Sequence, residues 1–196
     1  MGEESKREQI LDAAGRAFGS YGFRKTSVAD IVREAGVARA TVYNYFPTKE
    51  EIFSAVVRRE INDVIRKVRD AAMKETNTLD RLRTAVTTQV DEIRNKVNVF
   101  RITTASLHEM LPRTHEASQE LVEEALKVYR WILEEGVRAG EVVVDDVETT
   151  SWTILLAFKG VFITTVSGHI EERIPGVLDT LLEIIWNGLR PREDVQ

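Results

Sequence analysis

The stretch that decides the fold is TSVADIVREAGVARATVYNYFPTK, which runs from Thr26 to Lys49. Ser27 followed by Asp30 has the spacing of a capped helix N-terminus, and apolar residues then recur at helical spacing up to Gly36. After a short turn, a second short helix is expected from Arg39 to Phe46, closed by a proline. Two short helices joined by a glycine turn are typical of a helix-turn-helix.

The second helix of this pair has an apolar inner side and a polar outer side. The spacing predicts that Ala35, Val37, Val42 and Phe46 are buried together. A DNA major groove is about 12 Å wide and admits one such helix. The pattern alone leaves two interpretations open, a DNA-reading helix and a helical hairpin with a polar outer face. The residues expected to point outward are Arg39, Ala40, Thr41, Asn44 and Tyr45.

The residues themselves resemble the DNA-binding domain of the tetracycline repressor (TetR) family. The resemblance rests on Ala-Gly-Val, Thr-Val-Tyr, Tyr-Phe and Lys-Glu-Glu at their spacings between residues 35 and 51. Upstream, Ile10-Leu-Asp-Ala-Ala, Phe18 and Tyr21-Gly-Phe match the first helix and glycine turn of that family, and Lys49-Glu-Glu-Ile-Phe opens its fourth helix. The match covers roughly residues 7 to 55. It favours DNA binding over the plain hairpin.

The resemblance also implies roles for single residues. Arg39 has the chemistry to bind guanine through two hydrogen bonds, and Asn44 the chemistry to bind adenine or a phosphate. Tyr45 is expected at a base edge or sugar. Two alternatives stay open, namely that Tyr43 packs internally and that Arg39 touches only a phosphate. The implied phosphate contacts are Ser27, Thr41, Tyr43 and Lys49, and the implied base-reading positions are Arg39, Ala40, Asn44 and Tyr45.

Charge and composition limit the classes of fold and function that remain possible. The chain has 196 residues, a net charge of -5 and 43% hydrophobic residues, which predicts a packed core rather than disorder. Residues 1–49 hold eight basic and six acidic residues, so a mildly basic head precedes an acidic body. The absence of cysteine excludes disulfide scaffolds, thiolate metal sites and cysteine nucleophiles.

The rest of the chain is predicted to be helical, so the fold class is all-α. We expect a helix-turn-helix DNA-binding domain at residues 1–49 and a larger helical effector-binding and dimerisation domain at residues 50–196. Glycine and proline are few, and no strand pattern or internal repeat occurs. Helices are expected at about residues 7–19, 26–36, 39–46, 49–69, 77–95, 99–111, 116–139, 145–167 and 175–190.

The last two predicted helices carry more apolar surface than one core face needs, which predicts a subunit interface. The TetR resemblance implies dimerisation through the same two helices, against the alternative of a large monomeric core. The contact would be isologous, with two helices from each chain. The residues expected at the interface are Trp152, Leu155, Phe158, Phe162, Leu178, Leu181, Leu182, Ile185 and Trp186.

An effector pocket is predicted in the body, where aromatic residues mix with a few polar groups. Plain core packing is the alternative for each of its residues. The lack of fixed charges in this set favours an apolar or aromatic effector. The candidate lining residues are Phe100, Thr104, Leu107, His108, Met110, Tyr129, Trp131, Phe158 and Phe162.

Catalysis and metal binding find no support in the sequence. The three histidines have no metal-ligand spacing, and neither a phosphate-binding glycine loop nor a nucleophile elbow occurs. The N-terminus lacks a signal peptide, and the longest apolar stretch is too short to span a bilayer, so a cytoplasmic location is expected. We therefore predict no cofactor, no metal and no membrane contact.

Taken together, the sequence predicts a homodimeric transcriptional regulator that binds a palindromic operator in double-stranded DNA. The TetR resemblance implies a repressor that a small hydrophobic effector releases, although activation stays open. The alternative from another class is a helical ligand-binding or interaction protein that binds no operator.

Overall fold

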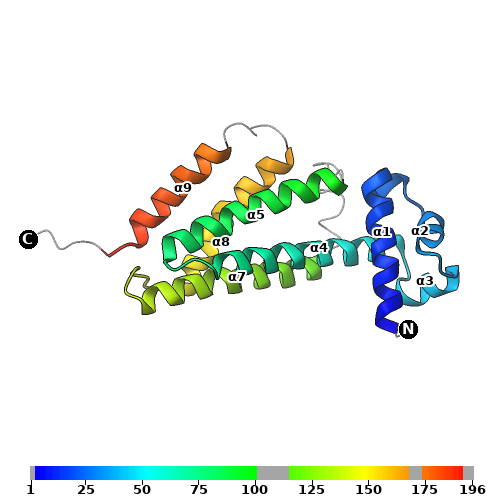
Figure 1. Ribbon diagram of the computed structural model, residues 1–196, viewed down its shortest axis with the longest axis horizontal. Coiled ribbons are helices and arrows are strands. Elements are labelled where there is room, and N and C mark those ends of the chain that lie inside the picture. Colours follow the sequence, from blue (N-terminus) through cyan, green and yellow to red (C-terminus); the bar gives the residue numbers. More distant parts are fainter. Residues whose placement is uncertain (1–2, 101–114, 168–173, 192–196) are drawn as a thin grey trace, which may run out of the picture. The chain divides into compact units, whose positions relative to one another are not determined.

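The computed structural model describes residues 3–100, 115–167 and 174–191, and every regular element within these ranges is an α-helix (Figure 1). The all-α prediction is confirmed. Of the described residues, those up to Asn62 belong to one compact unit, and Asp63–Arg94 with the residues from Glu120 onward belong to a second. The helices are α1 (Glu3–Lys25), α2 (Val28–Ala35), α3 (Arg39–Tyr45), α4 (Lys49–Ala72), α5 (Thr78–Phe100), α7 (His115–Arg138), α8 (Val147–Ser167) and α9 (Ile174–Leu189).

The first helix differs from its predicted extent. The sequence predicts that this helix stops at Gly19-Ser20-Tyr21-Gly22. Gly22, with φ of 76° and ψ of 162°, does break α1, but helical structure resumes and continues to Lys25. Gly19 keeps helical geometry, so the positive φ that only glycine adopts easily falls three residues later. The predicted helix over residues 99–111 lies almost wholly outside the described residues.

The core of the first unit is built by the inner faces of α1 to α4. Ile10 and Phe18 from α1, Ile31 from α2 and Val42 from α3 are all at most 1% exposed. Of the four residues predicted to be buried together, Val42 and Phe46 belong to this cluster and Val37 packs against it, while Ala35 is also buried.

Three aromatic rings close this core at one end. The ring of Phe53, on α4, lies 5.0 Å from the ring of Phe18 and 4.9 Å from that of Phe23, both in edge-to-face geometry. Such pairs favour a fixed geometry over loose apolar contact. In Figure 1, α2 and α3 lie beside α1, and α2 is in contact with both α1 and α3.

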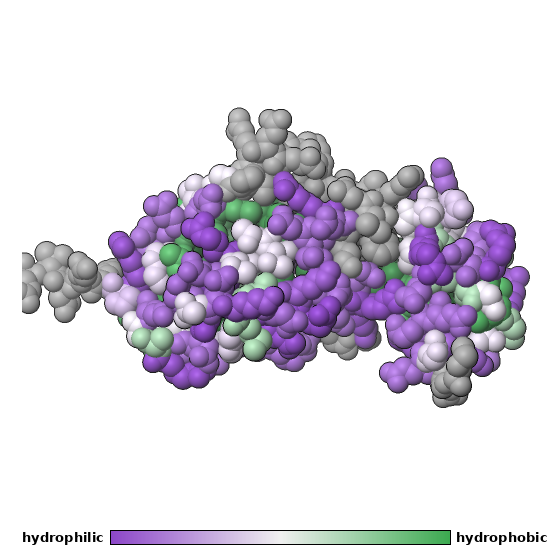
Figure 2. Space-filling model, in the orientation of Figure 1, coloured by the Kyte–Doolittle hydropathy of each residue, from purple (hydrophilic) through white to green (hydrophobic). Residues whose placement is uncertain are grey.

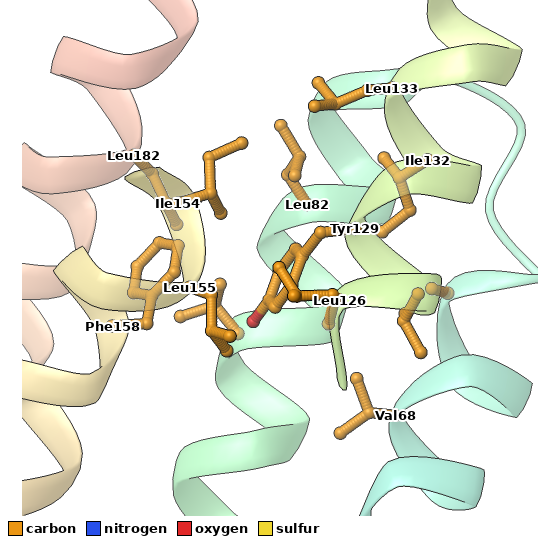
Figure 3. Close-up of a cluster of buried hydrophobic side chains, with 14 of the residues drawn as sticks. Val68, Leu82, Leu126, Tyr129, Ile132, Leu133, Ile154, Leu155, Phe158 and Leu182 are labelled. Atoms are coloured by element: carbon orange, nitrogen blue, oxygen red, sulfur yellow. The ribbon is translucent and has the colours of Figure 1, made fainter. Parts of the chain in front are cut away.

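The core of the second unit is built from the later part of α4 and from α5, α7, α8 and α9, and it extends from Val64 on α4 to Leu189 at the end of α9. Figure 3 shows Tyr129 of α7 among leucines of α5, α7 and α8, with Phe158 on the facing helix α8. The two rings are stacked with their centroids 6.5 Å apart. Tyr129 is 2% exposed, and its hydroxyl donates a hydrogen bond to Gln89 Oε1 at 2.8 Å. Burial raises the pKa of the Tyr129 hydroxyl, so it remains a donor.

The N-terminus of α5 approaches α7 and the turn after it very closely. The Thr78 amide donates to Glu141 Oε2 at 2.6 Å, and this hydrogen bond lowers the pKa of Glu141. A Cβ built on Gly136 would meet the Thr78 hydroxyl oxygen and lie 2.9 Å from Val142 Cγ2. Only glycine therefore permits this approach.

Glycine and aspartate shape the connection from α7 to α8. Gly140 has φ of 69°, and Asp146 accepts hydrogen bonds from the hydroxyl and amide of Thr149. Those bonds, the hydroxyl one first, lower the pKa of Asp146. Within the connection, the Val143 amide donates to the Leu189 carbonyl at 2.7 Å and so satisfies the C-terminal end of α9.

Candidate nucleic-acid interface

The interface begins at Ser27, the N-cap of α2. Its hydroxyl accepts from the Asp30 amide at 3.2 Å, and the Asp30 carboxylate accepts from the Ser27 amide at 3.0 Å. This reciprocal capping box satisfies two amides that the helix itself leaves unpaired. Hydrogen bonds from Ser27, side chain first, lower the pKa of Asp30, and Arg33 adds to the effect. Ser27 is itself exposed, as a phosphate contact requires.

The turn between α2 and α3 depends on Gly36. Its φ of 63° and ψ of 28° lie in the left-handed region, and its amide donates to the Val32 carbonyl at 3.0 Å. This geometry ends α2 and redirects the chain into α3. Gln9 of α1 adds a hydrogen bond from its side-chain amide to the Ala35 carbonyl at 2.9 Å. The glycine was predictable from the sequence, whereas the contact from Gln9 was not.

The α3 helix is anchored by Val42, which is fully buried, and presents a polar face on the opposite side. Its N-terminal Arg39 extends along this face, where the guanidinium lies 5.5 Å from the centre of the Tyr43 ring and donates to the Tyr43 hydroxyl at 3.3 Å. No acidic residue occurs in α3, so the face suits a polyanion. Of the predicted contact residues on α3, Arg39, Ala40, Tyr43 and Asn44 are exposed, and Thr41 and Tyr45 are half-buried.

Lys49 lies at the start of α4 and differs from the other predicted contacts. Its ammonium donates to the Phe23 carbonyl at 3.0 Å and to the Thr26 carbonyl at 3.1 Å. The same nitrogen lies 4.3 Å from the centre of the Phe23 ring, a cation–π distance. Lys49 is half-buried, so the turn between α1 and α2 already engages its charge.

The first unit therefore brings together a capped α2, a glycine turn and a short α3 with an exposed polar face. Comparison with known proteins identifies this arrangement. The family described as "Bacterial regulatory proteins, tetR family" matches residues 10–56, and "Tetracyclin repressor-like, C-terminal domain" matches residues 75–162. The chain belongs to the TetR family. It is a DNA-binding transcriptional regulator, and regulators of this family bind operators as dimers and respond to small molecules.

Relatives of similar length match most of the chain. The Bacillus subtilis fatty acid metabolism regulator protein is 22% identical over 185 residues, which cover 94% of this chain and 95% of that protein. The transcriptional repressor KstR2 of Rhodococcus jostii is 26% identical, over 92% of this chain and 93% of its own. The crystal structure of B. subtilis FadR in complex with stearoyl-CoA has a TM-score of 0.72 at 22% identity, covering 92% of this chain and 98% of that one.

The predicted pocket residues of this TetR-family regulator are placed only in part. Tyr129 and Phe158 lie together in the core of the second unit. Trp131 is half-buried on α7, where the Arg81 guanidinium lies 5.2 Å from the centre of its ring. Thr104, Leu107, His108 and Met110 lie outside the described residues, as do the side chains of Phe100 and Phe162.

The predicted interface residues divide between the core and the surface of one chain. Trp152 is 38% exposed, and its indole N–H donates to Glu148 Oε1 at 3.1 Å. Glu148 in turn pairs with Arg130, and this pairing raises the pKa of the guanidinium. Of the other predicted residues, Leu155, Phe158, Leu178 and Leu182 are buried in the second core, and Leu181, Ile185 and Trp186 pack against it half-buried.

The sequence did not single out the apolar residues that are most exposed on α8 and α9. Leu156 is 56% exposed, Val177 45% and Ile184 64%. Hydrophobic residues also reach the surface of the second unit in Figure 2, among many hydrophilic ones. Exposed side chains of this size on two helices that are in contact with each other are typical of a subunit interface.

The described part of the chain has neither a membrane-spanning helix nor a cluster of metal ligands. None of its helices has an apolar stretch long enough to cross a membrane. Within the same residues, no group of three or more histidine, cysteine, aspartate or glutamate side chains has the arrangement of a metal site.

Proposed function

We propose that the outer face of α3 reads operator bases while the start of α2 binds the DNA backbone. The observation that carries this proposal is the geometry of α3, where a buried Val42 fixes the helix and Arg39, Tyr43 and Asn44 are exposed opposite it. Arg39 pairs with guanine and Asn44 with adenine, because these side chains match the donor and acceptor pattern of those bases. Tyr43 supplies a neutral donor to a phosphate, and Ser27 does the same when its hydroxyl, which donates to Asp30 Oδ2 at 2.6 Å without DNA, turns to the phosphate.

The Arg39–Tyr43 contact supports this division of roles. A free arginine side chain loses considerable rotamer freedom when it binds a base. Here the ring of Tyr43 and its hydroxyl already hold the guanidinium on the exposed face. Arg39 therefore binds a guanine at a lower entropic cost. Tyr43 contributes to DNA affinity in two ways, by its own phosphate contact and by holding Arg39 in place.

The effector we propose is a long-chain acyl thioester of coenzyme A that releases the protein from DNA. Support comes from the full-length similarity to a fatty acid metabolism regulator and from the fold shared with FadR, whose structure holds stearoyl-CoA. The side chains of the second core are of the apolar kind that lines an acyl-chain site, and the hydrogen bond from buried Tyr129 to half-buried Gln89 adds a polar point. An effector coupling of about 1–3 kcal/mol is sufficient for release, and it acts equally in both directions.

The wider assignment follows from the same features. We propose a DNA-binding domain at residues 1–49, an effector and dimerisation domain at residues 50–196, a cytoplasmic location and no catalytic activity. The exposed apolar residues of α8 and α9, together with Trp152, form the surface between the two subunits. A two-fold axis through that surface directs the two α3 helices to inverted half-sites.

Selection of bound duplexes from a random DNA pool tests the DNA half of the proposal. We expect an enriched palindrome, and Arg39→Ala should relax the preference at one base pair per half-site by about 1–3 kcal/mol. Uniform weakening across all operator variants would instead assign Arg39 to a phosphate. Enrichment of no sequence would contradict operator reading by α3.

Titration with stearoyl-CoA and, separately, with free coenzyme A tests the effector half on the selected duplex. We expect the acyl thioester to release DNA at concentrations where coenzyme A does not. Equal release by both compounds would contradict an acyl-chain site. If neither compound released the DNA, an acyl thioester would not be the effector, but the proposal that the protein binds an operator would still stand.

A further inference from the structure

A side-chain hydrogen bond ties the turn between α2 and α3 to α1. Gln9 Nε2 donates to the carbonyl of Ala35, the last residue of α2, at 2.9 Å. The last carbonyls of a helix have no partner within it, so each of them needs a donor from elsewhere. Ala35 is 4% exposed, so its carbonyl has little access to water, and the loss of its donor would be costly.

The turn itself provides few restraints on the side that belongs to α2. Gly36 has φ of 63° and ψ of 28°, and an added Cβ there would meet no atom within 4 Å. Glycine changes φ and ψ more freely than other residues, so no packed side chain at this position limits the angle between α2 and α3. After the glycine, Val37 packs against the core of the first unit. The bond from Gln9 restrains the turn before the glycine.

Packing gives Gln9 a fixed position on α1. Ile10 and Ala13, which follow it on α1, are fully buried, so they set the register of this helix. Arg16 follows Gln9 by seven residues and so lies on the same face of α1, where it donates to Glu34 Oε1 at 2.8 Å. This face therefore contacts the last two residues of α2. The Arg16–Glu34 pair is exposed and contributes little by itself, so the bond from Gln9 is the stronger restraint.

A second residue of α1 contacts the far end of α3. Phe46 is the C-cap of α3 and is 4% exposed, and the Arg7 guanidinium lies 5.4 Å from the centre of its ring. Gln9 thus acts just before α3 and Arg7 acts just after it. The first two turns of α1 hold both ends of the segment that carries α3.

We propose that Gln9 is a positioning residue for operator recognition, which fixes the turn between α2 and α3 and so the direction of α3. The inference rests on the proposed function, in which α3 reads bases. A helix of seven residues is about 10 Å long, so a tilt of about 10° at the turn moves its far end by about 2 Å. Hydrogen bonds to base edges accept changes in length of only about 0.5 Å. Loss of the bond therefore weakens the base contacts of α3 more than the contact of Ser27, which lies before the turn.

The affinities for two duplexes test this role in the full-length dimer. Gln9→Met removes the amide group but keeps an unbranched side chain of similar length. We expect this variant to bind the duplex selected above about tenfold more weakly, while its affinity for a scrambled duplex of the same length stays almost unchanged. Gln119→Met, the same replacement at an exposed position of α7, should change neither affinity.

Three results would overturn the inference. An unchanged affinity of Gln9→Met for the selected duplex would show that α3 does not need the bond. Equal weakening on both duplexes would assign Gln9 to a phosphate contact or to general stability, because neither depends on base sequence. Gln9→Lys keeps a donor of similar reach, and its charge suits the C-terminal end of α2, so the ratio of its two affinities should stay near that of the wild-type protein. A ratio as low as that of Gln9→Met would show that the hydrogen bond is not the cause.

Hydrogen exchange provides a measurement that needs no DNA. The amides from Gly36 to Thr41 should exchange faster in Gln9→Met, because the turn opens more often, whereas those of α8 and α9 should not change. Binding is measured where circular dichroism shows the variant fully folded. If Gln9→Met does not fold, Gln9→Glu replaces it, since the carboxylate keeps the shape of the side chain but cannot donate at neutral pH.

The outcomes also separate this inference from the proposed function. If the wild-type protein enriched no duplex, the proposed function would fail, and exchange in the turn would still decide whether Gln9 holds it. Unchanged exchange in the turn would refute the inference even if the wild-type protein bound its operator.

Discussion

Replacing Gly36 with alanine tests whether the left-handed turn controls the direction of α3. The φ of 63° costs an L-residue about 1–2 kcal/mol, since its Cβ crowds the backbone. An added Cβ would meet no atom within 4 Å, so no packing penalty adds to this cost. Alanine also lowers the entropy of the unfolded chain, which returns about 0.4–1 kcal/mol. The expected net loss of stability is therefore about 1 kcal/mol, or about 2–4 °C in Tm.

Gly140 provides a matched control in the second unit. Its φ is 69° and a Cβ there also meets no atom within 4 Å, so Gly140→Ala carries the same conformational cost. The two variants should lose similar stability, but only Gly36→Ala should lose DNA affinity. If the chain relieves about 1 kcal/mol of strain by turning α3, the affinity falls about fivefold for each half-site bound.

Thermal denaturation at one fixed protein concentration measures the first quantity, because the melting of a dimer depends on concentration. Titration of the selected duplex measures the second. Gly36→Asn should recover most of both losses, since asparagine tolerates the left-handed region better than alanine. Equal losses of DNA affinity in the Gly36→Ala and Gly140→Ala proteins would refute the reasoning.

Three further perturbations test other contacts. Gly136→Ala should destabilise the second unit by about 1–3 kcal/mol in urea denaturation, because the added methyl group overpacks against Thr78. The double variant with Thr78→Ala should recover part of that loss. If the losses of stability of the two single variants simply added, the clash would be refuted. Ile184→Asp should convert the dimer to monomers in analytical ultracentrifugation, whereas Met73→Asp, at a similarly exposed site, should leave the protein dimeric. If the Ile184→Asp protein were still a dimer, the subunit interface would lie elsewhere. The capping box lowers the pKa of the Asp30 carboxyl, so this group should titrate below 3.8 by NMR. Its stabilisation of α2 is then complete above pH 3.8 and disappears as the pH falls through the lowered pKa. A titration midpoint at or above 3.8 would argue against the capping box.

The helix-turn-helix could be predicted closely because local chemistry determines its boundaries. Ser27 caps α2, Gly36 ends it in the left-handed region, and Val42 is buried as its spacing requires. The break in α1 could be predicted only to the segment Gly19–Gly22, because glycine is compatible both with helix and with positive φ. Which of Gly19 and Gly22 would break the helix depends on the contacts of Phe23 and Thr26 with α4, which local sequence does not reveal.

Features of the candidate sites that depend on tertiary contacts were harder to predict from the sequence. A helix that is apolar on nearly all sides does not indicate which side faces its own core, so buried Leu155 and exposed Leu156 could not be distinguished on α8. Similarly, the local sequence does not reveal that the chain brings the Phe23 carbonyl, 26 residues away, to the ammonium of Lys49. Site assignments for these residues remain predictions.

The placement of the tryptophans has a practical consequence for spectroscopy. All three, Trp131, Trp152 and Trp186, belong to the second unit, where one lies against a guanidinium and another is hydrogen-bonded to a carboxylate. The first unit has tyrosine and phenylalanine but no tryptophan. Intrinsic fluorescence excited at the red edge of tyrosine absorption therefore reports on the effector and dimerisation unit alone. Labelled DNA reports on the other unit, and the natural chain thus permits the two halves of the regulatory response to be timed separately in one sample.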